Sequence, residues 1–412
     1  MPRSFDRRGF LTAAGGGAFG LAVGTGAAAA AGNASAAIAQ SVPFHGEHQA
    51  GIATAAQDRL FFATFDLTIE TKSELRDLLR DWTAAAAAMT AGWPVGAAGG
   101  RLDAPPLDTG EAVGLPPARL TMTFGLGETV FSQGGKDRFG LAARKPAALS
   151  PLGALPGDGL EAARSGGDLC VQACADDPTV AFHAVRNLAR IARGAAVLRW
   201  SQLGFGRTSS TQSTQSTARN LQGFKDGTNN LHGNDEAAMN RSVWVGDEEP
   251  AVWFRGGSYL VSRRIRMLIE TWDRSSLGDQ EATIGRFKAS GAPLTGRHEH
   301  DVPDLAAKRK DGLGVIAADA HIRLAAPATN GGLHILRRGY SYTDGIDPVT
   351  GELDAGLFFL AFQRDPHRQF AAIQRRLGEH DALGEYIVHT GSGLFAVPPG
   401  IRPGGFLAQG LF

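Results

Sequence analysis

The segment with the most suggestive chemistry lies in the middle of the sequence, where a single acid stands between two glycines. It reads Gly223-Phe224-Lys225-Asp226-Gly227-Thr228-Asn229-Asn230. Because glycine adopts backbone angles that other residues resist, we expect Asp226 to sit on a tight turn. Side chains on rigidly held loops are disproportionately functional. Taken alone, however, the segment is better explained as an ordinary Asp-Gly turn between two strands.

Two further segments supply an imidazole and a pair of guanidinium groups. They read Asp319-Ala320-His321-Ile322-Arg323-Leu324-Ala325-Ala326-Pro327 and Ile335-Leu336-Arg337-Arg338-Gly339-Tyr340-Ser341-Tyr342. An acid, a histidine and an arginine are the three groups that a haem peroxidase needs. Histidine ligates the iron on one face. On the other face an acid–base group moves the peroxide proton, while a cation stabilises the charge that develops as the O–O bond breaks.

Together, the segments at 223–230, 320–327 and 335–342 resemble the dye-decolourising (DyP-type) haem peroxidases. They are most similar to the exported, deferrochelatase-like branch of that family, and residues 43–52 match near the start of the mature chain. Several separate motifs in the same order make this resemblance specific. It implies a haem b peroxidase, with one haem per chain, that uses hydrogen peroxide to oxidise a bulky organic electron donor such as a dye or a phenol.

The resemblance assigns the central roles to individual residues. His321 matches the axial ligand of the haem iron, and a buried histidine that is hydrogen-bonded without a metal is the alternative. Asp226 matches the distal acid–base, which takes a proton from peroxide and delivers it to the leaving oxygen. Arg337 matches the distal arginine, which holds peroxide and stabilises negative charge. Its proximity would favour the charged form of Asp226.

Further positions match haem contacts of the family. Directly after the distal acid come Gly227, Thr228 and Asn229, close enough in sequence to touch haem. Arg286 matches a position where a cation suits a haem propionate, although a salt bridge on a helix surface explains it equally well. The family usually has Asn-Pro-Arg where this chain has Ala326-Pro327-Ala328. At these three positions we therefore expect backbone contacts to haem in place of side-chain contacts.

Two roles have more than one candidate. Arg338 competes with Arg337 for the distal role, and because neighbouring residues of a strand face opposite sides, only one of them can face haem. We expect the other arginine to meet solvent or a carboxylate. A proximal histidine is usually oriented by a carboxylate on its second ring nitrogen, and the candidates for that carboxylate are Asp381 and Glu385.

Other potential ligands carry weaker signals. The run His298-Glu299-His300-Asp301 is a candidate divalent-metal cluster, but without a further ligand at a suitable spacing a structural loop is favoured. Cys170 and Cys174 lie in an alternating, strand-like stretch, where residues four apart are separated by ~13 Å. A disulfide needs Cα atoms within roughly 7 Å. We therefore expect two small core residues rather than a disulfide or a haem thiolate.

The composition and the N-terminus predict an exported globular protein. The chain has 412 residues, enough for two domains or one large one. Lys+Arg and Asp+Glu are both 41, which predicts no nucleic-acid partner. Arg7-Arg8 precedes a weakly hydrophobic Ala/Gly-rich stretch, a pattern typical of a twin-arginine (Tat) signal, which we assign to residues 1–39. This predicts a periplasmic or extracellular, cell-envelope location.

Hydrophobic periodicity predicts a duplicated α+β fold. The first half shows the element order of a ferredoxin-like unit: strand 59–67, helix 71–90, strand 120–127, strand 169–175, helix 180–193 and strand 197–205. The second half repeats that order more loosely: a strand at 243–245 or 257–261, helices at 265–272 and 279–289, strands at 333–336 and 357–363, and a helix at 366–378.

This order predicts two ferredoxin-like halves, antiparallel sheets with flanking helices, at residues 40–217 and 218–412. The resemblance adds a dimeric α+β barrel-like architecture, haem bound in the C-terminal half, and a homodimer or higher homo-oligomer. It also leaves an alternative in which haem is the substrate, its iron being released for uptake with membrane components as partners. A non-catalytic haem-binding protein is disfavoured, because plain storage needs neither Asp226 nor Arg337.

Overall fold

The computed structural model describes residues 40–96 and 102–412. The Tat signal predicted at 1–39 therefore lies outside the described residues. Among the residues that are described, no helix is both long and apolar enough to cross a membrane.

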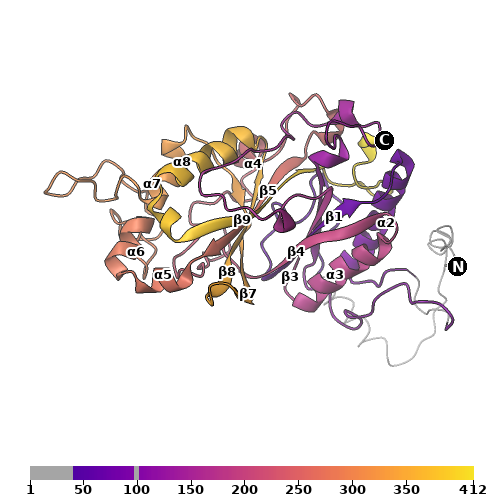
Figure 1. The fold of residues 1–412 in the computed structure, drawn as a ribbon, viewed down its shortest axis with the longest axis horizontal. Helices are drawn as coiled ribbons and strands as arrows, with labels where there is room; N and C mark the ends of the chain where they lie inside the picture. Colours follow the sequence, from indigo (N-terminus) through magenta and orange to yellow (C-terminus); the bar gives the residue numbers. More distant parts are fainter. Residues whose placement is uncertain (1–39, 97–101) are drawn as a thin grey trace.

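The N-terminal half is a ferredoxin-like unit, as its sequence predicts. Its main elements are β1 (Arg59–Leu67), α2 (Lys72–Thr90), β2 (Thr121–Gly127), β3 (Leu169–Ala175), α3 (Pro178–Ile191) and β4 (Ala196–Arg207). The strands pair antiparallel, with the second and third strands followed by the first and the fourth. Helices α2 and α3 lie side by side against this sheet (Figure 1).

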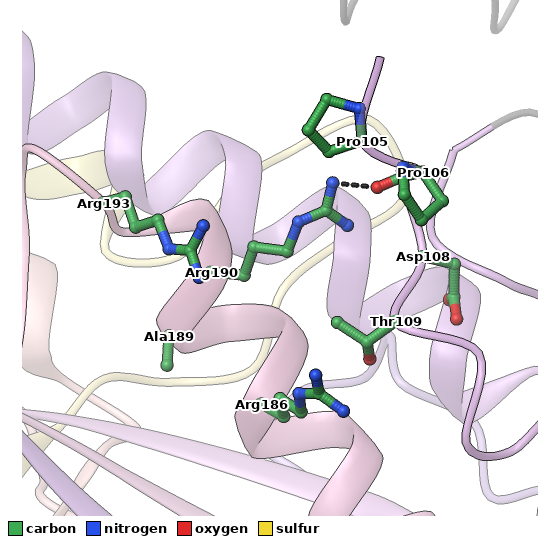
Figure 2. Close-up of a pocket in the computed structure, with 8 residues that line it drawn as sticks. All are labelled: Pro105, Pro106, Asp108, Thr109, Arg186, Ala189, Arg190 and Arg193. Carbon is green, nitrogen blue, oxygen red and sulfur yellow. Dashed lines mark hydrogen bonds between the residues drawn. The ribbon is translucent and has the colours of Figure 1, made fainter. Parts of the chain in front are cut away.

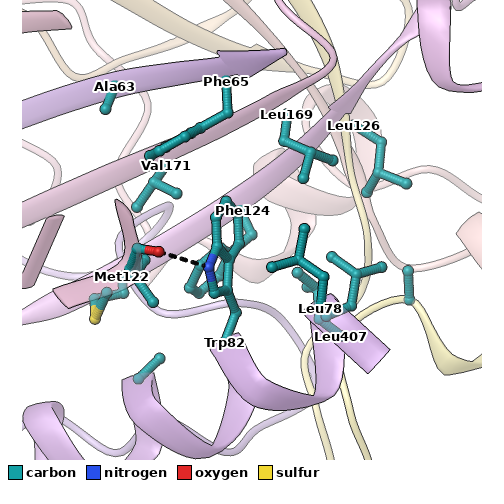
Figure 3. Packing of buried hydrophobic residues seen from close by; sticks show 14 of the residues in the cluster. Ala63, Phe65, Leu78, Trp82, Met122, Phe124, Leu126, Leu169, Val171 and Leu407 are labelled. Atoms are coloured by element: carbon teal, nitrogen blue, oxygen red, sulfur yellow. Dashed lines mark hydrogen bonds between the residues drawn. The ribbon is translucent and has the colours of Figure 1, made fainter. Parts of the chain in front are cut away.

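Helix α2 forms and docks for reasons that are visible in its sequence. Its N-cap is Thr71, whose hydroxyl accepts a hydrogen bond from the Glu74 amide while the Glu74 side chain accepts one from the Thr71 amide. Thr71, rather than Ser73 in the first turn, therefore caps the helix. Leu78 and Trp82 face the sheet at helical spacing and are buried (Figure 3). The Trp82 indole donates to the carbonyl of Leu188 in α3 at 3.0 Å, which satisfies its only polar atom.

The C-terminal half repeats the same strand order. Its main strands are β5 (Ser258–Met267), β7 (Tyr340–Ile346), β8 (Leu353–Gln363) and β9 (Ile387–Val397). They pair so that β7 and β8 are followed by β5 and β9, again the second and third strands before the first and fourth. Helix α8 (Ala372–His380) connects β8 to β9. The long connection from β5 to β7 contains α5 (Ile269–Arg274), α6 (Leu277–Ile284), α7 (His321–Ala325) and β6 (Leu336–Arg337).

The two halves join into one closed sheet. Strand β2 pairs with β9 and β4 pairs with β7, and because β5 also pairs with β8 the sheet returns to its starting strand. Aromatic side chains from both halves meet inside it: Phe62 of β1 packs on Trp200 of β4, Phe358 of β8 and Phe395 of β9. This shared core makes the halves a single packed body, in agreement with the barrel-like architecture that the resemblance implies.

Several bounds predicted for the C-terminal half are wrong. Residues 243–245 form no strand and follow a short helix, α4 (Glu236–Ser242). The alternative at 257–261 is correct but too short, because β5 continues to Met267 and the next helix begins only at Ile269. The helix predicted at 279–289 ends at Ile284, since Gly285 adopts a left-handed φ of 87°. Strands β7 and β9 were not expected at all.

Cys170 and Cys174 are the small core residues that the sequence predicts. Both thiols are free and buried on β3. Burial raises the pKa of the Cys170 thiol well above its usual value, so this thiol has little thiolate character.

A surface segment of the N-terminal half is held against α3 by arginines. Arg190 donates to the carbonyl of Leu107 at 2.6 Å and to that of Pro106, and Arg186 forms an ion pair with Glu111. The hollow of about 360 Å³ between the segment and the helix is seen in Figure 2. Arg190 and Arg186 have structural contacts here, since one satisfies carbonyls of a segment without regular secondary structure and the other pairs with its carboxylate.

Candidate active site

A cavity of about 780 Å³ lies in the C-terminal half. Strands β5 and β8, helix α8 and the helical turn just before it (His367–Ala371) provide apolar walls, through Ile265, Leu357, Phe359, Ile373 and Phe370. Each site residue predicted from the sequence lines this cavity: Asp226, Gly227, Thr228, Asn229, Arg286, His321, Ala326, Pro327, Ala328 and Arg337. Segments more than a hundred residues apart are thus brought together around one space.

His321 is the first residue of α7 and is oriented by a carboxylate. Its Nδ1 lies 2.6 Å from Oδ2 of Asp381, whose other oxygen accepts a hydrogen bond from the Leu383 amide at 2.9 Å. Of the two candidate carboxylates, Asp381 is therefore the partner, while Glu385 is exposed. Because a carboxylate only accepts, Nδ1 carries the proton and Nε2 keeps its lone pair.

The surroundings of His321 increase the basicity of its ring. Burial lowers the pKa of His321, the Asp381 carboxylate raises it through its charge and its hydrogen bond, and the net shift is upward. The charge of Asp226 raises this pKa further, and the charge of Arg337 lowers it. The electrostatic fields of both distal side chains therefore reach the His321 ring. The His321 side chain keeps 32% of its surface exposed, and that surface faces the cavity. A carboxylate behind the ring is the arrangement that strengthens an imidazole as a metal ligand.

Asp226 and Arg337 form an ion pair on the cavity wall. Nη1 of Arg337 donates to Oδ1 of Asp226 at 2.8 Å, and both side chains are largely buried. One anionic and one cationic group are thus held next to each other with the cavity in front of them. Such a pair can accept a proton at one atom and stabilise a developing negative charge at another.

The backbone of this pair is fixed by the residues that follow Asp226. Gly227 has φ 87°, and a Cβ there would lie 2.9 Å from the Cα of Ser209, so only glycine fits. Asn230 accepts from the Arg337 amide and donates to the Arg337 carbonyl, both at 2.8 Å. Its amide also donates to the Ser210 carbonyl. Asn230 lies in the same motif as Asp226, but its position in the sequence alone did not indicate this structural role.

Arg338 does not share the cavity with Arg337. The neighbouring arginines point to opposite sides, as expected for a strand, but Arg338 is shielded from solvent and contacts no carboxylate within residues 40–96 and 102–412. It is fully buried and donates to the Thr54 carbonyl at 2.5 Å and to the Gln57 side-chain oxygen. The prediction that the second arginine meets solvent or a carboxylate was therefore wrong. Neutral oxygen acceptors from a loop distant in sequence bind the Arg338 guanidinium instead.

Arg286 is buried beside the cavity without a carboxylate partner among the described residues. Its Nη1 donates to the carbonyls of Gly291 at 2.7 Å and Glu299 at 2.9 Å, and burial lowers the pKa of the guanidinium. This excludes the alternative of a surface salt bridge. The segment Ala326-Pro327-Ala328 also reaches the cavity, in a short 3₁₀ turn that Asn330 holds through the carbonyls of Leu324 and Ala326.

The candidate metal cluster at 298–301 has other contacts. His298 and His300 are largely exposed, whereas the Glu299 side chain is 12% exposed and lies on the cavity wall. Glu299 pairs with Lys225 and accepts a hydrogen bond from Thr228 at 3.2 Å. Its carboxylate thus pairs with the Asp226 segment, while Nε2 of the exposed His300 lies 3.9 Å from one of its oxygens.

One lining residue gave no signal in the sequence. His389 of β9 accepts a hydrogen bond from Nε of Arg263 at 3.2 Å and contacts the Gln374 amide at 3.2 Å. Burial, followed by the charge of Arg263, lowers the pKa of His389 to about 3, so the ring is neutral at ordinary pH. His389 stands in no motif with another candidate ligand, so its spacing in the sequence does not identify it as a residue of the site.

The lining of the cavity fits the haem that the sequence predicts. Haem is a flat and mostly apolar group with an iron that takes nitrogen ligands and two propionates that take cations. The cavity offers apolar walls, the Nε2 lone pair of His321 and the buried guanidinium of Arg286. The charge of Glu299 acts on the Arg286 guanidinium without a hydrogen bond between the two side chains, and a propionate would supply a directly paired anion.

Comparisons with known proteins agree with this geometry. Residues 49–206 match the family model "Dyp-type peroxidase, N-terminal", and residues 217–402 match "Dyp-type peroxidase, C-terminal". The chain is 40% identical over 369 residues to a protein named deferrochelatase from Escherichia coli K12, covering 87% of this chain and 84% of that protein.

Solved structures give the same result. A DyP-type peroxidase from Streptomyces coelicolor superposes with a TM-score of 0.81 at 43% identity, covering 90% of this chain and 96% of the other. One from Cellulomonas bogoriensis gives a TM-score of 0.79 at 41% identity, covering 90% and 98%. Both halves of the chain are matched in sequence and in fold. The chain therefore belongs to the DyP-type peroxidase family and is a haem-dependent enzyme that acts on peroxide and an organic electron donor.

Proposed function

We propose that His321 binds the haem iron and that Asp226 and Arg337 perform the peroxide chemistry on the opposite face. The observation that carries this proposal is the sharing of one cavity by the His321–Asp381 pair and the Asp226–Arg337 ion pair. Bound haem would supply a redox-active iron with an open coordination position. Protein side chains would transfer the proton, stabilise the developing charge and position the cofactor.

The distal pair would handle the proton and the charge. The Asp226 carboxylate accepts the first proton of hydrogen peroxide and returns it to the oxygen that leaves as water. Arg337 holds the peroxide and stabilises the negative charge that appears once that proton is removed. The 2.8 Å contact between the two side chains keeps the acceptor and the cation next to the same substrate.

The proximal pair and Arg286 would position the cofactor. Asp381 keeps the Nδ1 proton of His321 in place, which directs the Nε2 lone pair to the iron. Arg286 pairs with a propionate, and the backbone of 326–328 together with Gly227, Thr228 and Asn229 forms contacts along the ring.

Two replacements test the distal assignment. Asp226→Asn and Arg337→Leu should each bind haem normally and lose peroxide turnover, with a fall of about 10²- to 10⁴-fold for the acid–base residue. The matched control is Asp66→Asn, which breaks an exposed Asp–Arg pair in the N-terminal half and should leave turnover unchanged. Full activity in both distal variants would show that the assignment is wrong.

A second candidate function is the release of iron from haem. It is favoured by the name deferrochelatase of the Escherichia coli relative. The test is to incubate the haem-loaded protein with an iron chelator and a reductant and to record porphyrin fluorescence. Iron-free porphyrin with an intact ring would support this function, together with membrane iron-uptake components as partners. Retained haem under conditions that allow peroxide turnover would exclude it.

We also propose that the chain is exported through the twin-arginine pathway. The support is Arg7-Arg8 ahead of an Ala/Gly-rich stretch. Replacing both arginines by lysine should retain the protein in the cytoplasm, and unchanged export would contradict the proposal. Assembly into a homodimer or higher homo-oligomer is a further prediction, which light scattering of the purified protein would test.

A further inference from the structure

Glu299 lies where separate segments of the cavity wall meet. It belongs to the long connection between α6 and α7, far in sequence from the Asp226 segment, and its side chain is among the most buried carboxylates of the cavity. The peroxidase roles proposed above do not use it. A buried carboxylate beside a reaction site calls for a physical reason, because burying a charge is costly unless it is paired.

The Glu299 carboxylate contacts the residues on both sides of Asp226. One oxygen forms an ion pair with Nζ of Lys225, the residue immediately before the acid. The other accepts a hydrogen bond from Thr228 Oγ1 at 3.2 Å, two residues after the acid. The Thr217 hydroxyl adds a further hydrogen bond to the carboxylate. The turn that carries Asp226 is therefore held at both of its ends by one side chain.

The frame around this contact is rigid. The stem of Lys225 packs directly on Gly291, where an added Cβ would lie 2.7 Å from Lys225 Cδ. Arg286 joins the two ends of this frame, because its Nη1 donates to the carbonyls of both Gly291 and Glu299. The Lys225–Glu299 pair is thus fixed between backbone segments that a second cavity residue ties together.

The charge state of Glu299 agrees with such a role. Burial raises the pKa of Glu299, but hydrogen bonds from Lys225 and Thr217 lower it, and the net shift is downward. The group is therefore an ionised acceptor at neutral pH. The Glu299 contacts add to backbone hydrogen bonds of the same segment, from the Asp226 amide to the Ala218 carbonyl and from the Asn230 amide to the Gly227 carbonyl, both at 3.0 Å.

We propose that Glu299 is a positioning residue for the distal acid, whose carboxylate holds the 225–228 turn so that Asp226 stays paired with Arg337 and faces the cavity. The inference rests on the proposed role of Asp226. It assigns to Glu299 no contact with peroxide. A displacement of about 1 Å in a reacting group can slow a reaction by about 100-fold, so the loss of this contact has a measurable effect.

The first test is the rate constant for the reaction of haem-loaded protein with peroxide, followed by stopped-flow absorbance. Glu299→Ala should lower it by about 10- to 100-fold. Glu299→Gln should lower it less, because it keeps an acceptor for Thr228 and loses only the charge opposite Lys225. The matched control is Glu128→Gln, which breaks a half-buried Glu–Lys pair of 2.9 Å in the N-terminal half and should leave the rate unchanged.

A double variant separates positioning from an independent role. If Glu299 acts through Asp226, adding Glu299→Ala to Asp226→Asn should cause no further loss of rate. A further loss of the same size as in the single variant would overturn the proposal. If Asp226→Asn itself reacts at the wild-type rate, the distal assignment fails, and this result is distinct from a failure of the Glu299 inference.

Hydrogen–deuterium exchange of the haem-loaded protein provides a readout other than activity. In Glu299→Ala, peptides covering 219–230 should exchange faster, while those covering β1 in the N-terminal half should not change. Should Glu299→Ala fail to fold, Lys225→Met removes the same ion pair from the other side and should give the same local change. Unchanged exchange and unchanged rate, with Asp226→Asn still slow, would overturn the proposal.

Discussion

At the scale of single residues, the site consists of two hydrogen-bonded couples that line one cavity. His321 depends on Asp381 for its tautomer, and Asp226 depends on Arg337 for a partner. Neither couple is visible in the local sequence, since their members are separated by 60 and 111 positions. The His321–Asp381 couple therefore makes a prediction about Asp381, which does not itself perform the chemistry.

Asp381→Asn should weaken the proximal ligand without removing it. The amide cannot fix the Nδ1 proton of His321 as a carboxylate does, and loss of such a partner typically lowers metal affinity or activity by about 10- to 100-fold. A haemin titration monitored at the Soret band measures the affinity. Glu385→Gln is the matched control, because that side chain is exposed and should leave the affinity unchanged. An equal loss in both variants would contradict the assignment of Asp381.

At the scale of elements, short segments position the site and the helices stabilise the body that carries them. The turn at 225–228 allows no side chain at its glycine. Helix α2 is far from the cavity and supports the N-terminal core through its cap and its buried face. These two elements should therefore respond differently to replacement, one in activity and the other only in stability.

Gly227→Ala should impair both stability and peroxide turnover. The alanine would have to adopt a positive φ and would approach the Cα of Ser209 at 2.9 Å. Gly345→Ala is the control, since that glycine has φ 91° and open space around its Cβ position. We expect about 1–2 kcal/mol of destabilisation in the control, from the backbone alone, and a larger loss with reduced turnover in Gly227→Ala. Urea unfolding and a peroxidase assay measure the two effects, and equal losses would contradict the close approach.

Thr71→Ala should lower the free energy of unfolding by about 1 kcal/mol, the usual cost of removing an N-cap. Ser73→Ala should have little effect, because Thr71 and Glu74 form the capping box. Thermal unfolding distinguishes the two, and peroxide turnover should be unchanged in both. A larger effect at Ser73 would show that the helix begins elsewhere.

At the scale of the whole molecule, the closed sheet encloses charges as well as apolar side chains. Arg263 of β5 pairs with Asp158, and Arg264 pairs with Asp344 at 2.8 Å and Asp354 at 2.7 Å. His389 lies against Arg263 and is kept neutral, with its pKa lowered to about 3. In the folded state His389 therefore stays unprotonated at pH values where the same side chain in the unfolded chain, with a pKa near 6.5, binds a proton.

This predicts a specific acid sensitivity. Below pH 6.5 the unfolded chain takes up a proton on His389 and the folded chain does not until about pH 3. The free energy of unfolding should consequently fall by about 1.4 kcal/mol per pH unit in that window and be independent of this group above it. In His389→Gln, the loss of stability between pH 6 and pH 4 should be smaller by about 2–3 kcal/mol. Unfolding curves with parallel pH dependence in both proteins would contradict the lowered pKa.

The same charges explain which parts of the fold the sequence predicts. The N-terminal half follows simple patterns, and its strands and helices match the expected ranges closely. Strand β5 contains two consecutive arginines whose carboxylate partners come from distant segments. Local patterning therefore suggested that a helix begins at 265. In β9 the apolar pattern is interrupted by His389, Thr390 and two glycines, so it resembles a loop.

The site was predictable to the extent that short motifs carry it. Asp226, His321 and Arg337 stand in such motifs, and all three reach the cavity. The choice between Asp381 and Glu385 depended on a turn that only the structure defines. In the sequence Glu299 stood out because it lies between two histidines. In the structure its carboxylate contacts Lys225 and Thr228, which are distant in sequence. Such tertiary contacts have no counterpart in residue spacing.

The most direct test of the central claim is a visible spectrum of the purified protein with added haemin, recorded before and after one equivalent of peroxide. The account predicts a ferric Soret band that shifts on addition of peroxide. It also predicts that His321→Ala loses this band, while Asp226→Asn keeps the band and reacts with peroxide far more slowly. An unchanged band in His321→Ala, or a band in the wild-type protein that does not respond to peroxide, would contradict the account.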